Sequence, residues 1–290
     1  MGFIKNFIFS LSTLIPDRLY LQLISRHSLW YRIDFKNPKT FNEKLQRLKL
    51  YNRNSDYTKM VDKCDAKKYV SSIIWERYII PTLWVYNTFD EIDFDKLPNQ
   101  FVIKCTHDSG GIVICQNKKE FNKSLARKKI EKNLKNNYYI YAREWVYKNI
   151  KPRIIVEKYM VDESWVELKD YKVFCFNGEP KIIQVDFDRF KGHKRNIYNL
   201  NWEILPFEIL YPSDKSHKIN KPKCLEEMIY LAKKLSKNIP HVRIDFYIIN
   251  NQIYFWEMTF YHGWWFEDFR PREWDYKFWE WIKLPDFITN

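Results

Sequence analysis

Two carboxylates and an arginine come close together on a hairpin that the sequence predicts around residue 250. In that hairpin Asp245 stands directly opposite Glu257, and Arg243 lies on the same face. Carboxylates opposite each other on adjacent strands repel unless a cation lies between them. A hard ion such as Mg²⁺ takes carboxylate oxygens together with substrate phosphates, and an arginine binds a phosphate through paired hydrogen bonds. The pattern indicates either a metal and phosphate site or a structural arrangement in which Arg243 neutralises both acids.

The length of the turn decides whether the two acids meet. Residues 242–248 and 253–259 are expected to form the two strands. A strict two-residue turn would set Asp245 opposite Trp256, with Glu257 on the other face. A three-residue loop, 250–252, gives one polar and one apolar face, so we predict that loop. Its expected pairs are Asp245 with Glu257, Arg243 with Thr259, Ile244 with Met258, Phe246 with Trp256 and Ile248 with Tyr254.

A glycine pair marks a second candidate site. The chain has six glycines, and Gly110 and Gly111 lie between two predicted strands, 101–104 and 112–115. A loop with exposed backbone N–H groups covers phosphates, although an ordinary hairpin loop explains the pair equally well. Lys104 ends the first strand, and a lysine that points inward from a sheet usually meets an anion.

Helices and antiparallel hairpins position these residues. Thr40 and Glu43 have the spacing of a capping box, which predicts a helix through Tyr51. Asn177-Gly178 predicts a type I′ hairpin turn. Further helices are expected at 62–74, 124–136 and 222–239, and further strands at 153–157, 171–176 and 181–186. The fold class that follows is α+β.

Composition narrows the function classes. The 290 residues are 46% hydrophobic, enough for a full core, and their formal charge of +13 favours an anionic partner. The charge is spread along the chain without an RNA-binding aromatic signature, so no nucleic acid partner is expected. Five cysteines without a CxxC pair indicate a reducing, cytoplasmic location. Residues 1–16 are interpreted as an amphipathic helix that packs on the protein or makes peripheral contact with the inner face of the membrane.

Four longer segments occur in an order that matches a known family. They are PKTFNEKLQRLKLY (38–51), KCTHDSGG (104–111), DYKVFCFNGEPKIIQVDFDR (170–189) and RIDFYIINNQIYFWEMTFYHG (243–263). Together with Asp62-Lys63 and 156–160 they resemble the ATP-grasp superfamily. Within it they resemble the TupA-like branch, which is associated with teichuronopeptide and other surface-polysaccharide synthesis. The resemblance runs from about Pro38 to Gly263.

The resemblance implies an ATP-grasp fold with ATP and Mg²⁺ as cofactors. In that fold two α+β subdomains grip a nucleotide between antiparallel sheets. The implied segments are an N-terminal helical segment at 1–60, a nucleotide-binding subdomain with the glycine loop at 61–156, a metal- and phosphate-binding subdomain at 157–263, and an aromatic tail packed on the body at 264–290.

Each motif implies roles for its residues. Lys63 and Lys104 would contact the nucleotide phosphates, under a loop made of Asp108, Ser109, Gly110 and Gly111. Adenine would lie along Glu157, Lys158 and Met160, with Asp162 or Glu163 near the ribose. The implied catalytic residues are Lys104, Lys172 and Arg243, with Arg243 at the γ-phosphoryl group. The Mg²⁺ ligands would be Asp245, Glu257 and Thr259, the last standing where the superfamily usually has an asparagine.

The implied activity is that of an ATP-dependent carboxylate–amine ligase acting through an acyl phosphate. Its partners would be an acidic capsular or cell-surface polysaccharide precursor, which supplies the carboxylate, and an amino acid or other amine. Candidate substrate residues beside the motifs are His107, Asp186, Asp188, Arg189 and His262. The alternatives are an ATP-dependent phosphotransferase acting on a sugar or amide, a glycosyltransferase, and a non-enzymatic protein that binds polyanions or membranes.

Overall fold

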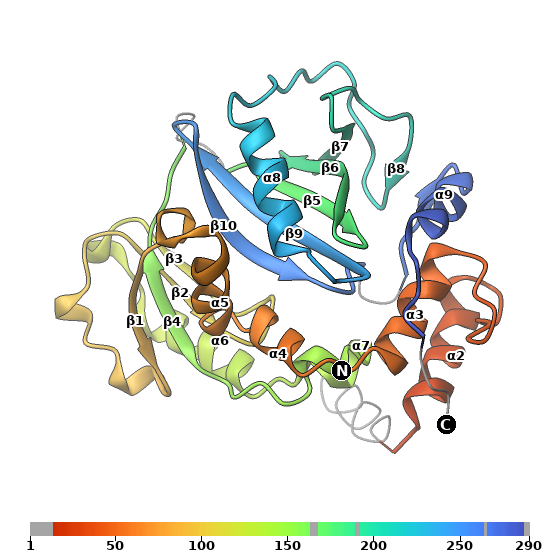
Figure 1. Ribbon diagram of the computed structural model, residues 1–290. Helices are drawn as coiled ribbons and strands as arrows, with labels where there is room; N and C mark the ends of the chain where they lie inside the picture. The colour runs from red at the N-terminus through yellow and green to blue at the C-terminus, as the bar shows by residue number, and fades with distance from the viewer. Residues whose placement is uncertain (1–13, 163–167, 189–191, 264–265, 287–290) are drawn as a thin grey trace.

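Two antiparallel sheets with helices around them form the computed structural model of the chain (Figure 1). The structure describes residues 14–162, 168–188, 192–263 and 266–286, so the helix predicted at 1–16 lies almost wholly outside the described residues. Helices and antiparallel sheets together confirm the α+β class. None of the helices in the described ranges is long and apolar enough to cross a membrane. The division into four segments stays a prediction.

The larger sheet separates an apolar core from a polar surface. Its strands, in the order β10-β9-β5-β6-β7, are β10 (Gln252–Thr259), β9 (His241–Ile249), β5 (Asp170–Phe176), β6 (Glu179–Phe187) and β7 (Lys194–Asn199). Val173 pairs with Ile183 on one side and Ile244 on the other, so alternate residues share an apolar face. Helices α8 (Leu225–Leu235) and α5 (Asp65–Ile74) join this core (Figure 1). The opposite face carries the charged residues of the same strands.

The smaller sheet has a core of its own. Its strands, in the order β1-β4-β2-β3, are β1 (Thr82–Tyr86), β4 (Ile154–Lys158), β2 (Phe101–Cys105) and β3 (Ile112–Cys115). Helix α6 (Lys123–Leu134) packs on β2 and β3, and Ile130 is buried with Ile103 and Cys105. Lys104 alternates with these two residues and therefore points to the other side of the sheet.

The β9–β10 hairpin has a two-residue turn, so the predicted three-residue loop at 250–252 is wrong. Asn250 and Asn251 have φ of 50° and 62° and form a two-residue turn, so Phe255 pairs with Phe246. A β-bulge between Phe255 and Glu257 then adds one residue. The predicted pairs of Phe246 with Trp256 and Ile248 with Tyr254 are therefore wrong. The bulge absorbs Trp256, and the predicted pairs Asp245–Glu257, Ile244–Met258 and Arg243–Thr259 are confirmed.

The remaining elements lie around the two sheets. Helix α3 (Phe41–Tyr51) begins after Thr40, whose hydroxyl accepts a hydrogen bond from the Glu43 N–H. Helix α9 (Glu273–Trp281) packs on α3 and buries Phe278. The others are α2 (Asp17–Ser28), α4 (Asp56–Val61), α7 (Tyr138–Ala142), the short pair β8 (Glu208–Ile209) and β11 (Phe269–Arg270), and the 3₁₀ turns Glu76–Tyr78, Phe89–Glu91, Phe94–Lys96, Lys118–Glu120 and Trp145–Tyr147.

Candidate active site

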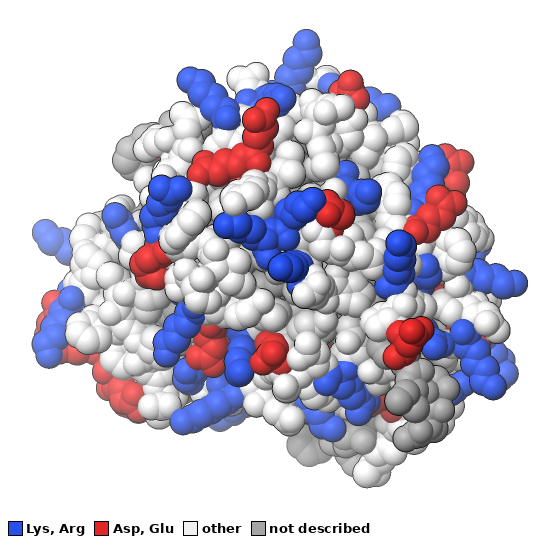
Figure 2. All heavy atoms as spheres, in the orientation of Figure 1, with Lys and Arg blue, Asp and Glu red and all other residues white. Residues whose placement is uncertain are grey.

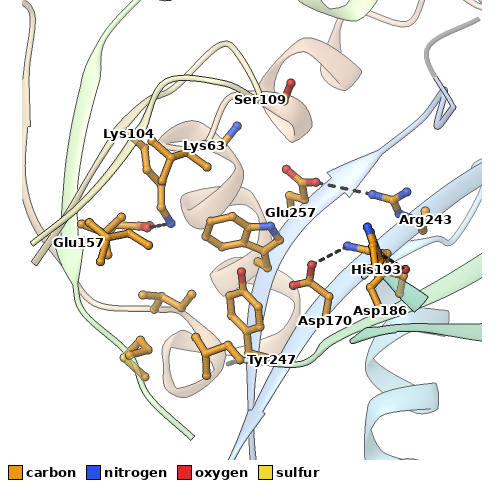
Figure 3. Close-up of a pocket in the computed structure, with 18 of the residues that line it drawn as sticks. Lys63, Lys104, Ser109, Glu157, Asp170, Asp186, His193, Arg243, Tyr247 and Glu257 are labelled. Carbon is orange, nitrogen blue, oxygen red and sulfur yellow. Dashed lines mark hydrogen bonds and ion pairs between the residues drawn. The ribbon is translucent and has the colours of Figure 1, made fainter. Parts of the chain in front are cut away.

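A cavity of about 960 Å³ lies between the polar faces of the two sheets (Figure 3). The smaller sheet contributes Lys104 from β2 and Glu157 from β4. The larger sheet contributes charged residues from β5, β6, β7, β9 and β10. Trp256, the residue at the β-bulge, lies between the two sheets. The Lys104 Nζ is 3.5 Å from the centre of its ring, so Trp256 connects the larger sheet to the smaller one.

Strand register sets the charged residues of the larger sheet in rows. Residues that pair across neighbouring strands point to the same side of a sheet. The charged side chains in each row of paired residues therefore share the side of the larger sheet that faces the cavity. The rows are Asp170–Asp186–Arg195 and Lys172–Asp245–Glu257. Each row therefore holds two neighbouring acids and one cation.

Ion pairs hold that face together. Lys172 Nζ lies 3.0 Å from both Asp170 and Asp245. Burial alone would lower the pKa of Lys172, but the two carboxylates outweigh it and raise that pKa. Asp186 accepts from the Arg195 Nε at 2.6 Å, and its cationic neighbours hold the pKa of Asp186 well below the usual range despite burial.

Lys104 and Glu157 form a buried ion pair on the opposite wall, with Lys67 as a second partner of the same carboxylate. Burial lowers the pKa of Lys104 to about 8, even though the charge of Glu157 acts to raise it. The pKa of Glu157 is lowered, because the two lysines outweigh the effect of its burial.

The glycine loop is fixed by its own hydrogen bonds. Asp108 accepts from the Gly111 N–H at 3.0 Å, and the Lys63 ammonium donates to the Asp108 carbonyl. A Cβ on Gly111 would lie 2.5 Å from the Cys105 sulfur, so only glycine fits there. Of the four predicted loop residues, Ser109 alone borders the cavity. The others shape the loop.

The three predicted metal ligands converge on one cationic group. The Arg243 guanidinium donates to Asp245 at 2.7 Å and to Thr259 at 3.3 Å, and it lies 3.7 Å from Glu257. Two carboxylates and a hydroxyl are hard oxygen donors, which is the donor set that Mg²⁺ prefers. Asp245 is completely buried, and its cationic neighbours hold its pKa low despite that burial. The donor set fits Mg²⁺.

Most of the predicted nucleotide and catalytic residues border this one cavity. Those that line it are Lys63, Lys104, Ser109, Glu157, Lys158, Met160, Lys172 and Arg243. The predicted substrate residue Asp186 and the predicted metal ligand Glu257 line it as well. Asp162 is buried beside Lys169 and is not part of the lining. Glu163 and Arg189 lie outside the described residues.

Three predicted substrate residues do not border the cavity. His107 is buried, and its Nε2 lies 3.1 Å from the Asn136 carbonyl oxygen. Asp188 is exposed at the end of β6. His262 is buried behind the lining, between His241 and Glu267. Their expected contacts with a substrate stay predictions.

The sequence analysis missed several lining residues. Asp170 shares a strand face with Lys172 two residues later, a spacing that was available as a signal. His193, Arg195 and Glu267 lie outside the segments that carry the family resemblance, so no motif points to them.

The surface charge is spread out, as the charge is along the sequence. Lysines and arginines are spread over the face in Figure 2 and interleaved with acids.

Comparison with known proteins adds a family match. A family model described as TupA-like ATPgrasp matches residues 43–283, which is most of the chain. No curated protein matches the chain.

Solved structures are similar at low identity. D-Alanine–D-alanine ligase from Bacillus anthracis complexed with ATP is 15% identical, with a TM-score of 0.41, over 70% of this chain and 54% of that one. A biotin carboxylase–β,γ-ATP complex from Campylobacter jejuni is 15% identical, with a TM-score of 0.40, over 75% of this chain and 41% of that one. D-Alanine–D-alanine ligase from Helicobacter pylori is 19% identical, with a TM-score of 0.35, over 71% of this chain and 55% of that one. The chain spans about half the length of these structures.

Proposed function

The chain belongs to the TupA-like ATP-grasp family, and from that premise we propose that it is an ATP-dependent ligase that joins a carboxylate to an amine through an acyl phosphate. The first half of the reaction moves the γ-phosphoryl group of ATP to the carboxylate and releases ADP. In the second half the amine attacks the acyl carbon and displaces phosphate.

One observation carries the proposal: Lys104 of the smaller sheet and Arg243 of the larger sheet face a single cavity that acidic side chains also line. Lys63 and Lys104 border it from one side, and Arg243 and Glu257 border it from the other. Phosphoryl transfer depends on in-line positioning and on neutralising the charge of the moving group. Cations on both walls support the neutralisation of charge, and the strands that carry Lys104 and Arg243 support the positioning.

The roles of single residues follow from their positions. Lys63 and Lys104 bind phosphate oxygens, and adenine lies along Glu157, Lys158 and Met160, which line the same wall. Asp245, Glu257 and Thr259 hold Mg²⁺, which neutralises phosphate charge when bound. Arg243 binds the γ-phosphoryl group once its guanidinium leaves Asp245. Lys172 approaches the phosphates or the acyl phosphate from its place between Asp170 and Asp245, whose charges it balances.

The substrates are an amino acid and a carboxylate on a capsular or cell-surface polysaccharide precursor. The proposed association of this branch with surface polysaccharides supports that assignment, and a chain with a net charge of +13 suits an acidic acceptor. Because the reaction consumes ATP, we place it in the cytoplasm.

The test is whether ADP release needs two substrates. We would incubate the protein with Mg-ATP and a uronic acid, such as glucuronate, with and without each of the common amino acids. A ligase releases ADP only when both are present, and hydroxylamine replaces the amine by trapping the acyl phosphate as a hydroxamate. ADP release with a single sugar or amide, together with a phosphorylated product, would instead establish a phosphotransferase.

A further inference from the structure

Glu267 is a cavity-lining acid that the proposed function leaves without a role. It is buried, with 6% of its surface exposed, and it borders the cavity together with Gly263 and Phe266. The other acids of the described lining lie within ion-pair distance of a lysine or arginine. Glu267 is held by a histidine, because its carboxylate bonds to the His262 Nδ1.

A hydrogen-bond chain through the core fixes the protons of this pair. His241 Nδ1 lies 3.0 Å from the Cys175 carbonyl oxygen, which can only accept, so Nδ1 carries a proton. Burial holds the pKa of His241 well below the usual range, so the ring is neutral and its Nε2 is an acceptor. His262 Nε2, 3.0 Å away, must therefore donate. One proton is left to be shared between His262 Nδ1 and the Glu267 carboxyl.

The shared proton gives the pair two forms. In one, His262 is neutral and Glu267 is a carboxylic acid. In the other, His262 is an imidazolium and Glu267 is a carboxylate. A cation that arrives from the cavity side favours the second form, because the carboxylate attracts it. A lysine or arginine paired with Glu267 would already occupy the place beside the carboxylate that a cationic ligand needs.

Two neighbours, Asn42 and Gly263, hold Glu267 in place. Its N–H donates to the Asn42 Oδ1 at 2.7 Å, and its carbonyl accepts from the Asn42 Nδ2 at 3.0 Å. Gly263, with φ of +79°, lies so close that a Cβ there would sit 2.6 Å from the Glu267 carboxyl carbon. His262 pairs the buried carboxylate from the protein side. Asn42 and Gly263 hold Glu267 at the cavity wall, where a cationic ligand can reach it.

We propose that Glu267 binds the ammonium group of the amine substrate, with His262 and His241 as positioning residues. This inference rests on the proposed ligase function and names the recognition element for its second substrate. The ligand is a primary amine that is protonated at neutral pH, such as an amino acid. In the reaction the ammonium gives one proton to the departing phosphate and one to water. Its nitrogen forms the amide bond as the bond between the acyl carbon and the phosphate oxygen breaks.

The test compares amine binding by the wild-type protein and two variants. Calorimetric titrations use each of the twenty common amino acids and its N-acetyl derivative, which lacks the ammonium group. We expect at least one free amino acid to bind the wild type, its N-acetyl derivative not to bind, and Glu267→Gln to weaken binding at least about tenfold. The matched control is Glu203→Gln, an exposed acid bonded to Asn199 away from the cavity, which should bind as the wild type does.

Several outcomes would overturn the assignment: equal affinity in Glu267→Gln, equal binding of an N-acetyl derivative, or no amino acid bound by the wild type. If Glu267→Gln does not fold, the comparison with N-acetyl derivatives on the wild type and the weaker binding expected of His262→Gln decide the question. The amino acid titrations are done without nucleotide, so they test the amine site at Glu267 and not the ATP site. A separate Mg-ATP titration reports on the proposed function, and Glu267→Gln should retain Mg-ATP binding.

Discussion

At the scale of the single residue, burial sets the protonation of the groups that matter. Lys104 is 4% exposed, and burial lowers its pKa to about 8. A lowered lysine pKa means that the positive charge is present below about pH 8 and is lost above it. A lysine that binds phosphate therefore becomes a weaker ligand in mildly alkaline solution.

The loss of the Lys104 charge at alkaline pH gives a prediction for ATP binding. The affinity of the wild type for Mg-ATP should fall as the pH rises from about 7.5 to 9.5, because the Lys104 charge is lost. Lys104→Met should bind at least about tenfold more weakly at pH 7.5 and change little with pH. Lys119→Met, at an exposed lysine, is the control. Calorimetry at the two pH values checks this, and a wild-type affinity that rises with pH would contradict it.

Glu144 provides a test that concerns stability. It is 2% exposed, and burial raises its pKa to about 8, although the charge of Lys49 acts to lower it. The folded state therefore binds a proton that the unfolded state releases above its ordinary carboxyl pKa, so stability falls as the pH rises through this window. Urea unfolding of the wild type should show a smaller free energy at about pH 7.5 than at about pH 5.5. Glu144→Gln, which resembles the neutral acid, should lose most of that slope, and an unchanged slope would refute the assignment.

Local sequence patterns identified single residues of the candidate site, but they did not identify all of the residues that pair with them. Lys104, Asp245 and Glu257 were named from local patterns, and all three lie at or directly beneath the cavity wall. The partnership of Lys104 with Glu157 joins residues 53 positions apart in the sequence, so no local spacing reveals it. Glu267 was missed because its partner Asn42 lies 225 positions away in the sequence and no motif links it to His262, five positions before it.

At the scale of the element, the strands with clear apolar runs were predictable, whereas β1, β7 and the two-residue strands β8 and β11 were not. β1 has no alternating burial, so it carries no period-two signal. β7 reads as polar, because Arg195 and Asn196 are buried against Asp186 and Asp214 and not against apolar side chains. The bulge at Trp256 escaped prediction because both registers give alternating faces along much of the hairpin.

The glycine loop gives the prediction for this scale. Gly111→Ala would place a methyl group 2.5 Å from the Cys105 sulfur, between strands that cannot separate without losing pairs. We expect a loss of about 1–3 kcal/mol in the free energy of unfolding, the usual result of overpacking. Gly110→Ala, whose Cβ would meet only Asn133 at 3.2 Å and Asp108 at 4.0 Å, is the matched control and should cost clearly less. Equal unfolding midpoints for the two variants would contradict this account of the loop.

At the scale of the whole molecule, the site exists because two cores are held face to face. The apolar clusters of the two sheets are separate, and the polar faces between them enclose the cavity. A ligand that contacts both walls therefore links both sheets, and it stabilises the folded protein by RT ln(1 + [L]/Kd). The sequence indicated two gripping units through family resemblance, whereas the cavity itself depends on contacts that only the assembled fold contains.

The most direct test of the account is a thermal-unfolding titration with Mg-ATP on the wild type, Lys104→Ala and Glu257→Ala, which take one residue from each wall. The wild type should gain roughly 2.7 kcal/mol when the nucleotide is in hundredfold excess over Kd, and the gain should need Mg²⁺. Both variants should be folded and should lose most of that gain. A folded wild type that Mg-ATP does not stabilise, or variants that gain as much as the wild type, would contradict a nucleotide site between the two sheets.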